Sequence, residues 1–387
     1  MKKTILLAAT AATLSTAAAH AETSVTLYGK IDTGIGFAKV DGSYTNPVTG
    51  VSSDFKASRF GATTGQTAGS RWGLRGKEDL GGGLYASFQL ESGFDSTNGS
   101  SSQGGRLFGR NATIGLGSAD WGEFRLGRQY NVATRMMAGM FGSNFGGGFT
   151  QLNTGGGLGF SSSYWVRYDN LALYESSSFG GGFRFSAGYA FNANDQTAAQ
   201  TGFATADNTR AITSGLSYNN GPLMAFVSYE QLNPSNKLSS AQTSATPRAY
   251  TVGASYDFEA LKIAAAYERA TDGWFAGKGL PSGAAINGFR GTPSNAFLNN
   301  FNTNSYLLAV SVPTGASSGM FASWQRVDPN GRDLTGGDST SNTFALGYTY
   351  SLSKRTSLYA VGSYTKNFAF LSDAKATEAL VGMRHSF

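Results

Sequence analysis

The chain ends in the stretch Glu378-Ala379-Leu380-Val381-Gly382-Met383-Arg384-His385-Ser386-Phe387, which alternates between two kinds of side chain. Successive side chains of a β-strand point to opposite faces. One face therefore carries Ala379, Val381, Met383, His385 and Phe387. Terminal aromatic residues are typical of strands that end in a membrane interface. The stretch predicts a strand that crosses a membrane.

Fifteen further segments alternate in the same way, and the breaks between the segments are short and long in turn. This rhythm is typical of a transmembrane barrel, with tight turns at one end and long loops at the other. We predict strands at residues 24–39, 70–79, 84–95, 107–117, 122–131, 164–175, 183–192, 210–219, 223–232, 248–258, 261–270, 304–313, 319–328, 341–352, 356–367 and 377–387. Long loops are expected at 40–69, 132–163, 233–247 and 271–303. An even strand number places both termini at the short-turn, periplasmic end.

The mean hydropathy is negative, and after residue 21 no apolar run is long enough for a membrane helix. In a water-filled barrel every second residue faces the lumen, so a polar average is expected. A soluble β-sandwich also alternates, but it needs neither sixteen strands nor a strict rhythm of loops. The fold class predicted is therefore all-β, a 16-stranded antiparallel transmembrane β-barrel. At this strand number the interior is wide enough for an aqueous channel.

The N-terminus has the features of a secretory signal. Lys2 and Lys3 precede an uncharged run that ends in Ala19-His20-Ala21, a small-x-small cleavage pattern. We expect residues 1–21 to be a signal peptide and residues 22–387 to form the barrel. Without the two lysines, 28 basic side chains remain against 24 acidic ones. This dispersed excess of about four positive charges does not suggest a nucleic-acid partner.

The residue types argue against an enzyme. The chain has no cysteine, and the only histidine after residue 21 is His385, which is predicted to face outward. A Ser-His pair inside the barrel is therefore excluded. The glycine runs at 81–83 and 146–148 are not followed by the Lys-Ser/Thr pair of a phosphate-binding loop. We predict no catalytic residue, no cofactor and no metal site.

Several motifs resemble the trimeric general porins of β-proteobacteria, the group that includes the Neisseria, Bordetella and Burkholderia porins. They occur along the whole chain after residue 21: Ser24-Val25-Thr26-Leu27-Tyr28-Gly29, Ser70-Arg71-Trp72-Gly73-Leu74-Arg75-Gly76, Phe88-Gln89-Leu90-Glu91-Ser92-Gly93-Phe94, Leu126-Gly127-Arg128-Gln129-Tyr130 and Gly382-Met383-Arg384-His385-Ser386-Phe387. The resemblance implies a homotrimer in the outer membrane of a Gram-negative bacterium, in contact with lipid and lipopolysaccharide. It also implies that the third loop folds into the channel as a constriction.

That third loop is residues 132–163. Its only charge is Arg135, and its methionines and phenylalanines could rest against the inner wall. The alternative is a flexible surface loop.

Strand parity assigns the side chains of the lumen. Basic and acidic groups are nearly balanced there, which predicts weak ion selectivity. In the resembling porins, Arg71, Arg75 and Arg125 would lie on the wall that the third loop leaves open. Each of these arginines could equally be an ordinary ion-paired wall residue. The residues predicted to line the pore or its constriction are Lys30, Asp32, Arg71, Arg75, Glu91, Arg125, Arg135 and Arg184. Phe387 is predicted to act in assembly.

The predicted function is a general diffusion porin: a passive, water-filled channel for small hydrophilic solutes and ions, with a weak preference for anions. A leucine at position 173, where the resembling family often has arginine, argues against strong anion selectivity. Two alternatives remain open at this point. One is a channel specific for one solute class, and the other is a surface adhesin or receptor that acts through the long loops.

Overall fold

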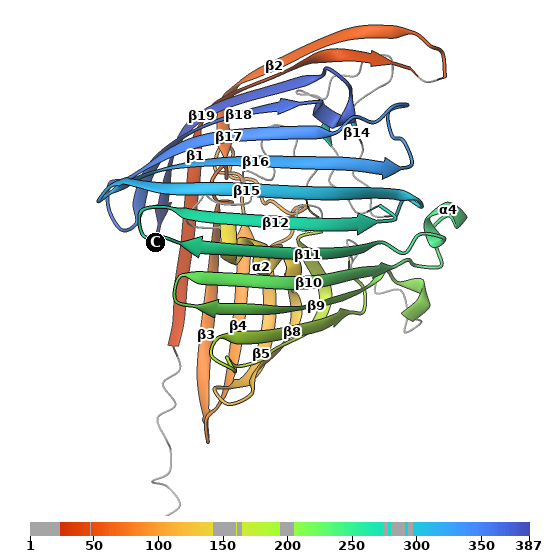
Figure 1. The fold of residues 1–387 in the computed structure, drawn as a ribbon. Helices are drawn as coiled ribbons and strands as arrows, with labels where there is room; N and C mark the ends of the chain where they lie inside the picture. Colours follow the sequence, from red (N-terminus) through yellow and green to blue (C-terminus); the bar gives the residue numbers. More distant parts are fainter. Residues whose placement is uncertain are drawn as a thin grey trace, which may run out of the picture.

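The computed structural model describes residues 24–46, 48–141, 160, 165–193, 205–273, 278–279, 291–292 and 297–387. Within them, one antiparallel sheet of seventeen strands dominates (Figure 1). Sixteen of these strands form the wall: β1 (Ser24–Thr45), β3 (Arg71–Gly81), β4 (Leu84–Gly93), β5 (Asn111–Ser118), β6 (Gly122–Tyr130), β7 (Arg167–Glu175), β8 (Phe183–Ala190), β9 (Arg210–Asn220), β10 (Leu223–Asn233), β11 (Arg248–Asp257), β12 (Lys262–Thr271), β15 (Phe301–Gly315), β16 (Ser318–Gly331), β17 (Ser341–Ser351), β18 (Thr356–Lys366) and β19 (Lys375–Ser386). Neighbours in this order are paired, and β19 pairs with β1. The wall is a closed barrel, so the predicted fold class is confirmed.

The predicted loop at 40–69 is wrong, because most of it is strand. β1 continues to Thr45 and turns back into β2 (Ser52–Thr64), which pairs with β1 from Thr33 to Thr45. The reason lies in β1 itself. One edge of β1 pairs with β3, but only along its first residues, Ser24–Lys30. The rest of this edge of β1 has no partner among the wall strands. Unpaired strand edges are costly, and β2 fills this one.

The C-terminus lies at the same end of the barrel as the tight turns, and the longer connections lie at the other end (Figure 1). The turns are as short as Gly221–Pro222 between β9 and β10. This arrangement confirms the predicted alternation of short turns and long loops. The predicted signal peptide, residues 1–21, lies outside the described residues.

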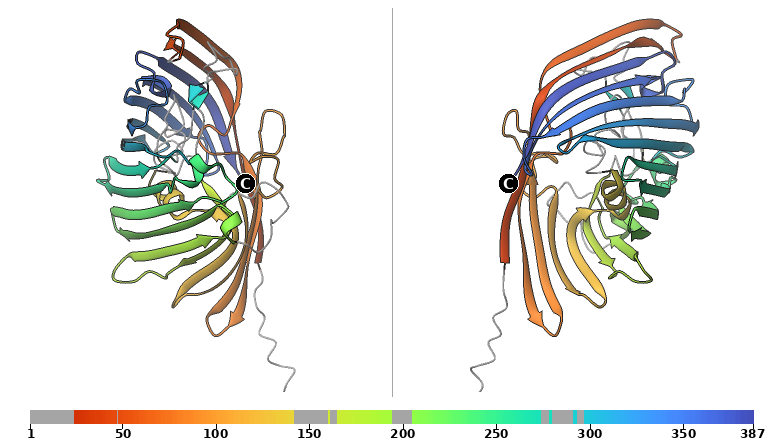
Figure 2. Two further views of the ribbon diagram at one scale, coloured as in Figure 1. Left: turned by 90° about the vertical axis from the view of Figure 1, so that its right-hand side faces the viewer. Right: turned by 60° about the vertical axis from the view of Figure 1, so that its left-hand side comes forward.

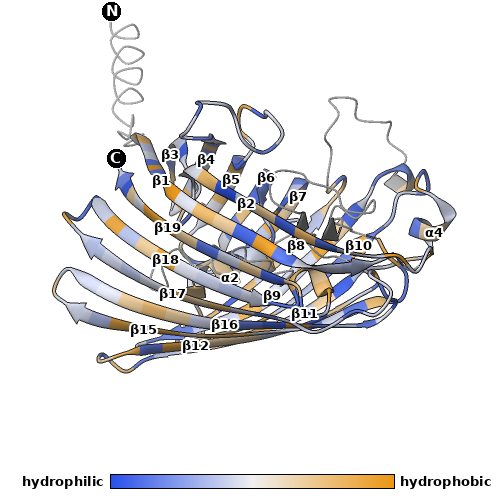
Figure 3. Ribbon diagram, turned by 90° about the horizontal axis from the view of Figure 1, so that it is seen from above, coloured by the Kyte–Doolittle hydropathy of each residue, from blue (hydrophilic) through white to orange (hydrophobic). Residues whose placement is uncertain are grey.

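The two faces of the wall follow the predicted parity. On β11, Tyr250 and Val252 are 49% and 47% exposed. Ala249, which precedes Tyr250, and Thr251, which lies between the two, are buried. Apolar and polar residues alternate along the wall strands in the same way (Figure 3). The outer face is therefore apolar, as a strand that borders lipid requires.

The helix α2 (Val132–Phe141) lies inside the barrel, on the concave side of the sheet (Figure 2). Its start is fixed by Asn131, whose side-chain oxygen accepts a hydrogen bond from the Thr134 N–H at 2.8 Å, as an N-cap does. Met136, Met137, Met140 and Phe141 are buried against the wall. The prediction that this part of the third loop rests on the inner wall is confirmed, and residues 142–159 and 161–163 lie outside the described residues.

The other elements of the described residues are small. β13 (Lys278–Gly279) pairs with β14 (Gly291–Thr292), and three short helical segments are η3 (Thr205–Asp207), α4 (Ser240–Thr243) and η5 (Phe368–Phe370). In the described part of the chain, no helix is long and apolar enough to cross a membrane.

Candidate functional site

The site begins with the attachment of α2 to the wall. The Val132 N–H donates to Thr213 Oγ1 at 2.8 Å, and the Ala133 N–H donates to Glu230 Oε1 at 3.0 Å. The hydroxyl of Tyr168 donates to the other oxygen of Glu230 at 2.8 Å, and Glu230 has no exposed surface. The first amides of a helix lack partners within it and attract negative charge. Glu230 satisfies one of them and thereby ties α2 to β9 and β10.

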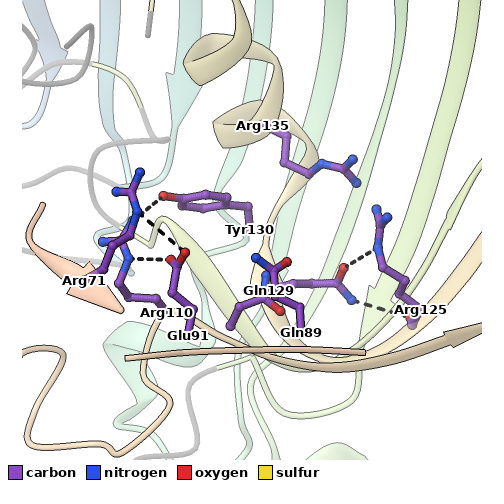
Figure 4. A pocket seen from close by; sticks show the side chains of 9 residues that line it. Arg71, Gln89, Glu91, Arg110, Arg125, Gln129, Tyr130 and Arg135 are labelled. Carbon is purple, nitrogen blue, oxygen red and sulfur yellow. Dashed lines mark hydrogen bonds and ion pairs between the residues drawn. The ribbon is translucent and has the colours of Figure 1, made fainter. Parts of the chain in front are cut away.

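α2 is held against β9 and β10, and a polar recess of about 240 Å³ lies between the helix and β3–β6 (Figure 4). Arg71 comes from β3, Glu91 from β4 and Arg125 from β6. Arg135 reaches into the same recess from α2 (Figure 4). Its other lining residues are Gln89, Arg110, Asn111, Gln129 and Tyr130.

The arginines of the recess are held by carboxylates. Glu91 accepts from Arg110 Nε at 2.6 Å and lies 3.6 Å from Arg71 Nε. Arg125 Nη1 lies 2.6 Å from Glu123 Oε2. These contacts fix the guanidinium groups in position, and such charge-assisted hydrogen bonds are the stronger ones in proteins.

Arg135 is also ion-paired. Its Nη2 lies 2.5 Å from Glu175 Oε2 on β7, and Arg184 Nη1 lies 3.9 Å from the other oxygen of Glu175. The carboxylate of Glu175 therefore offsets part of the positive charge of Arg135. The prediction from sequence treated Arg135 as the isolated charge of its loop, and it did not foresee this partner.

A second recess, of about 410 Å³, continues along the same wall and shares Gln89 and Arg125 with the first. It is lined by Arg75 and Lys77 of β3. The Arg75 guanidinium carbon lies 5.3 Å from the centre of the Tyr28 ring, and Lys77 Nζ lies 3.6 Å from that of Tyr85. Both contacts are close enough for cation–π attraction, which leaves the positive charge in place.

The structure does not bring all the predicted pore residues together. Arg71, Glu91, Arg125 and Arg135 share the first recess, and Arg75 lines the second. Lys30 is half-buried on β1 and Arg184 is largely exposed on β8, and neither lines these two recesses.

Asp32 does not lie on the channel surface as predicted, because it is completely buried. Its Oδ2 accepts from the backbone N–H groups of Thr67 and Ala68 and from the Thr67 hydroxyl, and its Oδ1 accepts from the Tyr359 hydroxyl. The first three bonds attach residues 67–68 to the wall, and the fourth links Asp32 to β18. Asp32 is thus a structural residue that parity alone could not distinguish from a pore-lining one.

Phe387 completes the pairing between β19 and β1. Its backbone exchanges two hydrogen bonds with Gly29, at 3.0 and 3.1 Å. Its ring covers Gly29 so closely that a Cβ atom at position 29 would overlap it. Only glycine leaves room for this ring.

Sequence reasoning missed Arg110 and Glu175 as members of the site. The predicted strand begins at residue 107, and its parity places Arg110 and Asn111 on opposite faces. The strand in fact starts at Asn111, and Arg110 and Asn111 line the recess together. No signal in the sequence pairs Glu175 with Arg135.

The described residues contain no group of three His, Asp or Glu side chains placed to hold a metal ion.

The comparisons with known proteins agree with this architecture. Residues 8–368 match the family model of the Gram-negative porins. An outer membrane porin protein of Bordetella pertussis is 55% identical over the whole of both chains. Outer membrane porin protein 32 of Delftia acidovorans is 31% identical, over 95% of this chain and 90% of its own.

Among solved structures, an anion-selective porin from Comamonas acidovorans is 26% identical with a TM-score of 0.63, over 95% of this chain and all of that one. Salmonella typhi OmpF, at 16% identity and a TM-score of 0.61, shares the fold over 94% of this chain and 97% of its own.

A closed barrel with a polar inner surface and these relatives is a channel-forming outer-membrane protein. The chain belongs to the Gram-negative porin family. It forms a general diffusion channel in the outer membrane, and the family consists of channels rather than enzymes.

Proposed function

We propose that this channel passes small hydrophilic solutes and ions with a weak preference for anions, and that α2 forms part of its constriction. One observation carries the proposal: bases outnumber carboxylates around the two recesses beside α2. The bases are Arg71, Arg75, Lys77, Arg110, Arg125 and Arg135, and the carboxylates that pair with members of this group are Glu91, Glu123 and Glu175.

A local excess of this kind decides selectivity because salt screens distant charges. The Debye length is about 8 Å at physiological ionic strength, so a passing ion responds mainly to the groups around it. The ion pairs within the recess reduce this excess of positive charge, so the preference for anions is weak. The relative from Comamonas is described as anion-selective, which is the same direction of ion preference as the one proposed for this channel.

The proposed experiment is the substitution Arg75→Glu, measured as the reversal potential of purified channels in a planar bilayer under a salt gradient. Arg75 is exposed on the lumen side, and no ion pair with a carboxylate is found for it in the described residues. Its replacement should therefore shift the reversal potential toward cation preference and change the single-channel conductance little. Raising the salt should reduce the shift.

The matched control is Lys262→Glu, which makes the same change of charge on β12, across the barrel. It should shift the reversal potential less. Equal shifts for the two variants would show that the field is not local to the α2 side, and the proposal would fail.

The direction of insertion and the targeting segment belong to the same proposal. Residues 1–21 act as a cleaved signal peptide, the short-turn end faces the periplasm, and the long-loop end faces outward and meets lipopolysaccharide. Support comes from the small-x-small pattern at Ala19-His20-Ala21 and from the position of the C-terminus at the short-turn end (Figure 1).

We also propose a homotrimer whose interface is the sector β19–β1–β3–β4–β5–β6. Tyrosine is enriched where a protein surface meets the membrane–water interface. On this sector every tyrosine of the wall strands points inward: Tyr28, Tyr44, Tyr85 and Tyr130. Outward-facing tyrosines occur instead on β7–β18: Tyr174, Tyr189, Tyr218, Tyr229, Tyr250, Tyr256, Tyr267, Tyr306, Tyr348, Tyr350 and Tyr364. A surface that contacts another subunit has no need of such a girdle.

A further inference from the structure

A row of bases stands on the outer face of the barrel at its long-loop end. Arg248, Arg269, Arg326 and Lys366 occupy outward positions on β11, β12, β16 and β18. Their parity is that of Tyr250, Tyr267, Trp324 and Tyr364, and the residues between them and these aromatics are buried on the lumen side. These bases therefore lie outside the channel and play no part in the recess described above.

Each base lies two residues beyond an outward aromatic ring on the same strand, toward the long loops. The four pairs are Tyr250 with Arg248, Tyr267 with Arg269, Trp324 with Arg326 and Tyr364 with Lys366. Two residues of strand span about 7 Å, or roughly 5 Å of height at the tilt usual in such barrels. Because aromatic rings mark the membrane–water interface, each base stands at headgroup level, just above its ring.

The strands have no counterpart of this row at the short-turn end, where the bases Lys354 and Arg355 lie in the turn between β17 and β18. Beyond the aromatic residues at that end, the outward positions of the same four strands and their neighbours are uncharged: Phe258, Ile263, Val312, Met320, Leu352 and Leu358. A requirement for solubility or for general anchoring would apply equally to both ends. The asymmetry instead indicates an anionic partner that is present in one leaflet only.

The pairing of neighbouring strands also places these bases near one another. Tyr250 is the register partner of Arg269, so Arg248 lies diagonally across from Arg269. Across β15, Asn304 is the partner of Arg269, and Tyr306 is the partner of Arg326. Among the described residues, Arg269 makes long hydrogen bonds of 3.4 Å to Asn330, and Arg326 forms an ion pair through its Nε with Asp328, at 2.9 Å. A guanidinium group binds two oxygens of a phosphate at once, so guanidinium groups on neighbouring strands suit a phosphorylated partner.

We propose that Arg248, Arg269, Arg326 and Lys366 form a binding surface for the phosphorylated headgroups of lipopolysaccharide in the outer leaflet. The aromatic ring below each base would contact the upper part of the acyl region, and the base would contact phosphate. The proposal deepens the lipid contact proposed above and rests on the long-loop end facing outward.

The test uses the full-length folded protein in zwitterionic detergent and measures the binding of lipopolysaccharide and of enzymatically dephosphorylated lipopolysaccharide. The triple variant Arg248→Gln, Arg269→Gln, Arg326→Gln removes three charges and keeps side chains of similar reach. Basic residues near an anionic membrane surface each add to the attraction. The variant should bind intact lipopolysaccharide at least tenfold more weakly than the wild type, and the dephosphorylated form should bind both proteins equally.

The matched control removes three bases elsewhere, with Arg184→Gln, Lys354→Gln and Arg355→Gln, and should bind intact lipopolysaccharide like the wild type. Heat modifiability verifies the fold of all three proteins. Equal binding of intact lipopolysaccharide by the wild type and by the triple variant at Arg248, Arg269 and Arg326 would overturn the proposal. So would full competition by millimolar inorganic phosphate, which would indicate a general anion patch. Binding in detergent does not depend on orientation, and protease accessibility of the long loops on whole cells tests the orientation separately.

Discussion

Glu230 illustrates how one buried side chain controls the shape of a water-filled channel. It is fully buried at the foot of α2, and it accepts hydrogen bonds from the Thr213 hydroxyl, the Ala133 amide and the Tyr168 hydroxyl. Buried donors left without an acceptor cost about 1–3 kcal/mol each. The position of α2, and hence the width of the passage beside it, depends on this carboxylate.

Glu230→Ala should leave these three donors unsatisfied and allow α2 to leave the wall for part of the time. Single-channel recordings should then show excess open-channel noise and a broader distribution of conductance. Glu230→Gln keeps the shape and one oxygen acceptor, so its effect should be smaller. Glu259→Ala, in the exposed turn before β12, serves as the control, and noise in Glu230→Ala no greater than in this control would contradict the role.

At the scale of elements, the terminal strand β19 closes the barrel against β1. The register runs from Lys30 opposite Ser386 to Asp41 opposite Lys375, and Phe387 adds two further bonds to Gly29. An open barrel would leave the edges of both strands unpaired in lipid, where each unpaired backbone group costs several kcal/mol. The last residue thus contributes both pairing and a ring that fills the space above Gly29.

Deletion of Phe387 should therefore lower the yield of folded, heat-modifiable protein in the outer membrane much more than Ser386→Ala does. Gly29→Val should act in the same direction, because its side chain would meet the Phe387 ring. The yield is measured by electrophoresis of heated and unheated membrane fractions. Similar yields from the Phe387 deletion and from Ser386→Ala would remove Phe387 from the assembly mechanism.

At the scale of the whole molecule, the outer face of the barrel divides into two sectors. The sector β7–β18 carries the outward tyrosines, and the sector β19–β1–β3–β4–β5–β6 carries outward aliphatic residues such as Val25, Leu27 and Ile114. The second sector adjoins the wall that lines the two recesses. The proposed subunit contact and the proposed basic side of the channel would therefore be the two faces of the same strands.

Ile114→Arg should dissociate the trimer and leave folded monomers, because a desolvated, unpaired charge is strongly destabilising in an interface. Leu308→Arg, on the tyrosine-bearing side, should instead lower the yield of folded barrel, at a cost of about 2–4 kcal/mol near mid-bilayer. Native electrophoresis in mild detergent gives the ratio of trimer to monomer. Ile114 and Leu308 are 64% and 48% exposed in the single chain, so both sites are open to test. A trimer that survives Ile114→Arg would place the interface elsewhere.

The sequence by itself determined the strand class, the wall of sixteen strands, the alternation of turns and loops, and the face of most side chains. These properties are local, because the two-residue period of a strand can be followed from one residue to the next. Tyr250 and Val252 face outward for this reason alone, and the burial of Met136, Met137 and Met140 followed from the apolar character of their loop.

Only the tertiary structure decided which charges meet. Asp32 has the parity of a lumen residue, yet Thr67 and, 327 positions away, Tyr359 bury it. Arg135 meets Glu175, and Glu230 meets the start of α2, across a barrel that must close before these groups are near each other. β2 exists because β3 pairs with only the first part of β1. Contacts between residues distant in sequence depend on the path of the whole chain, and no local pattern of residues contains that path.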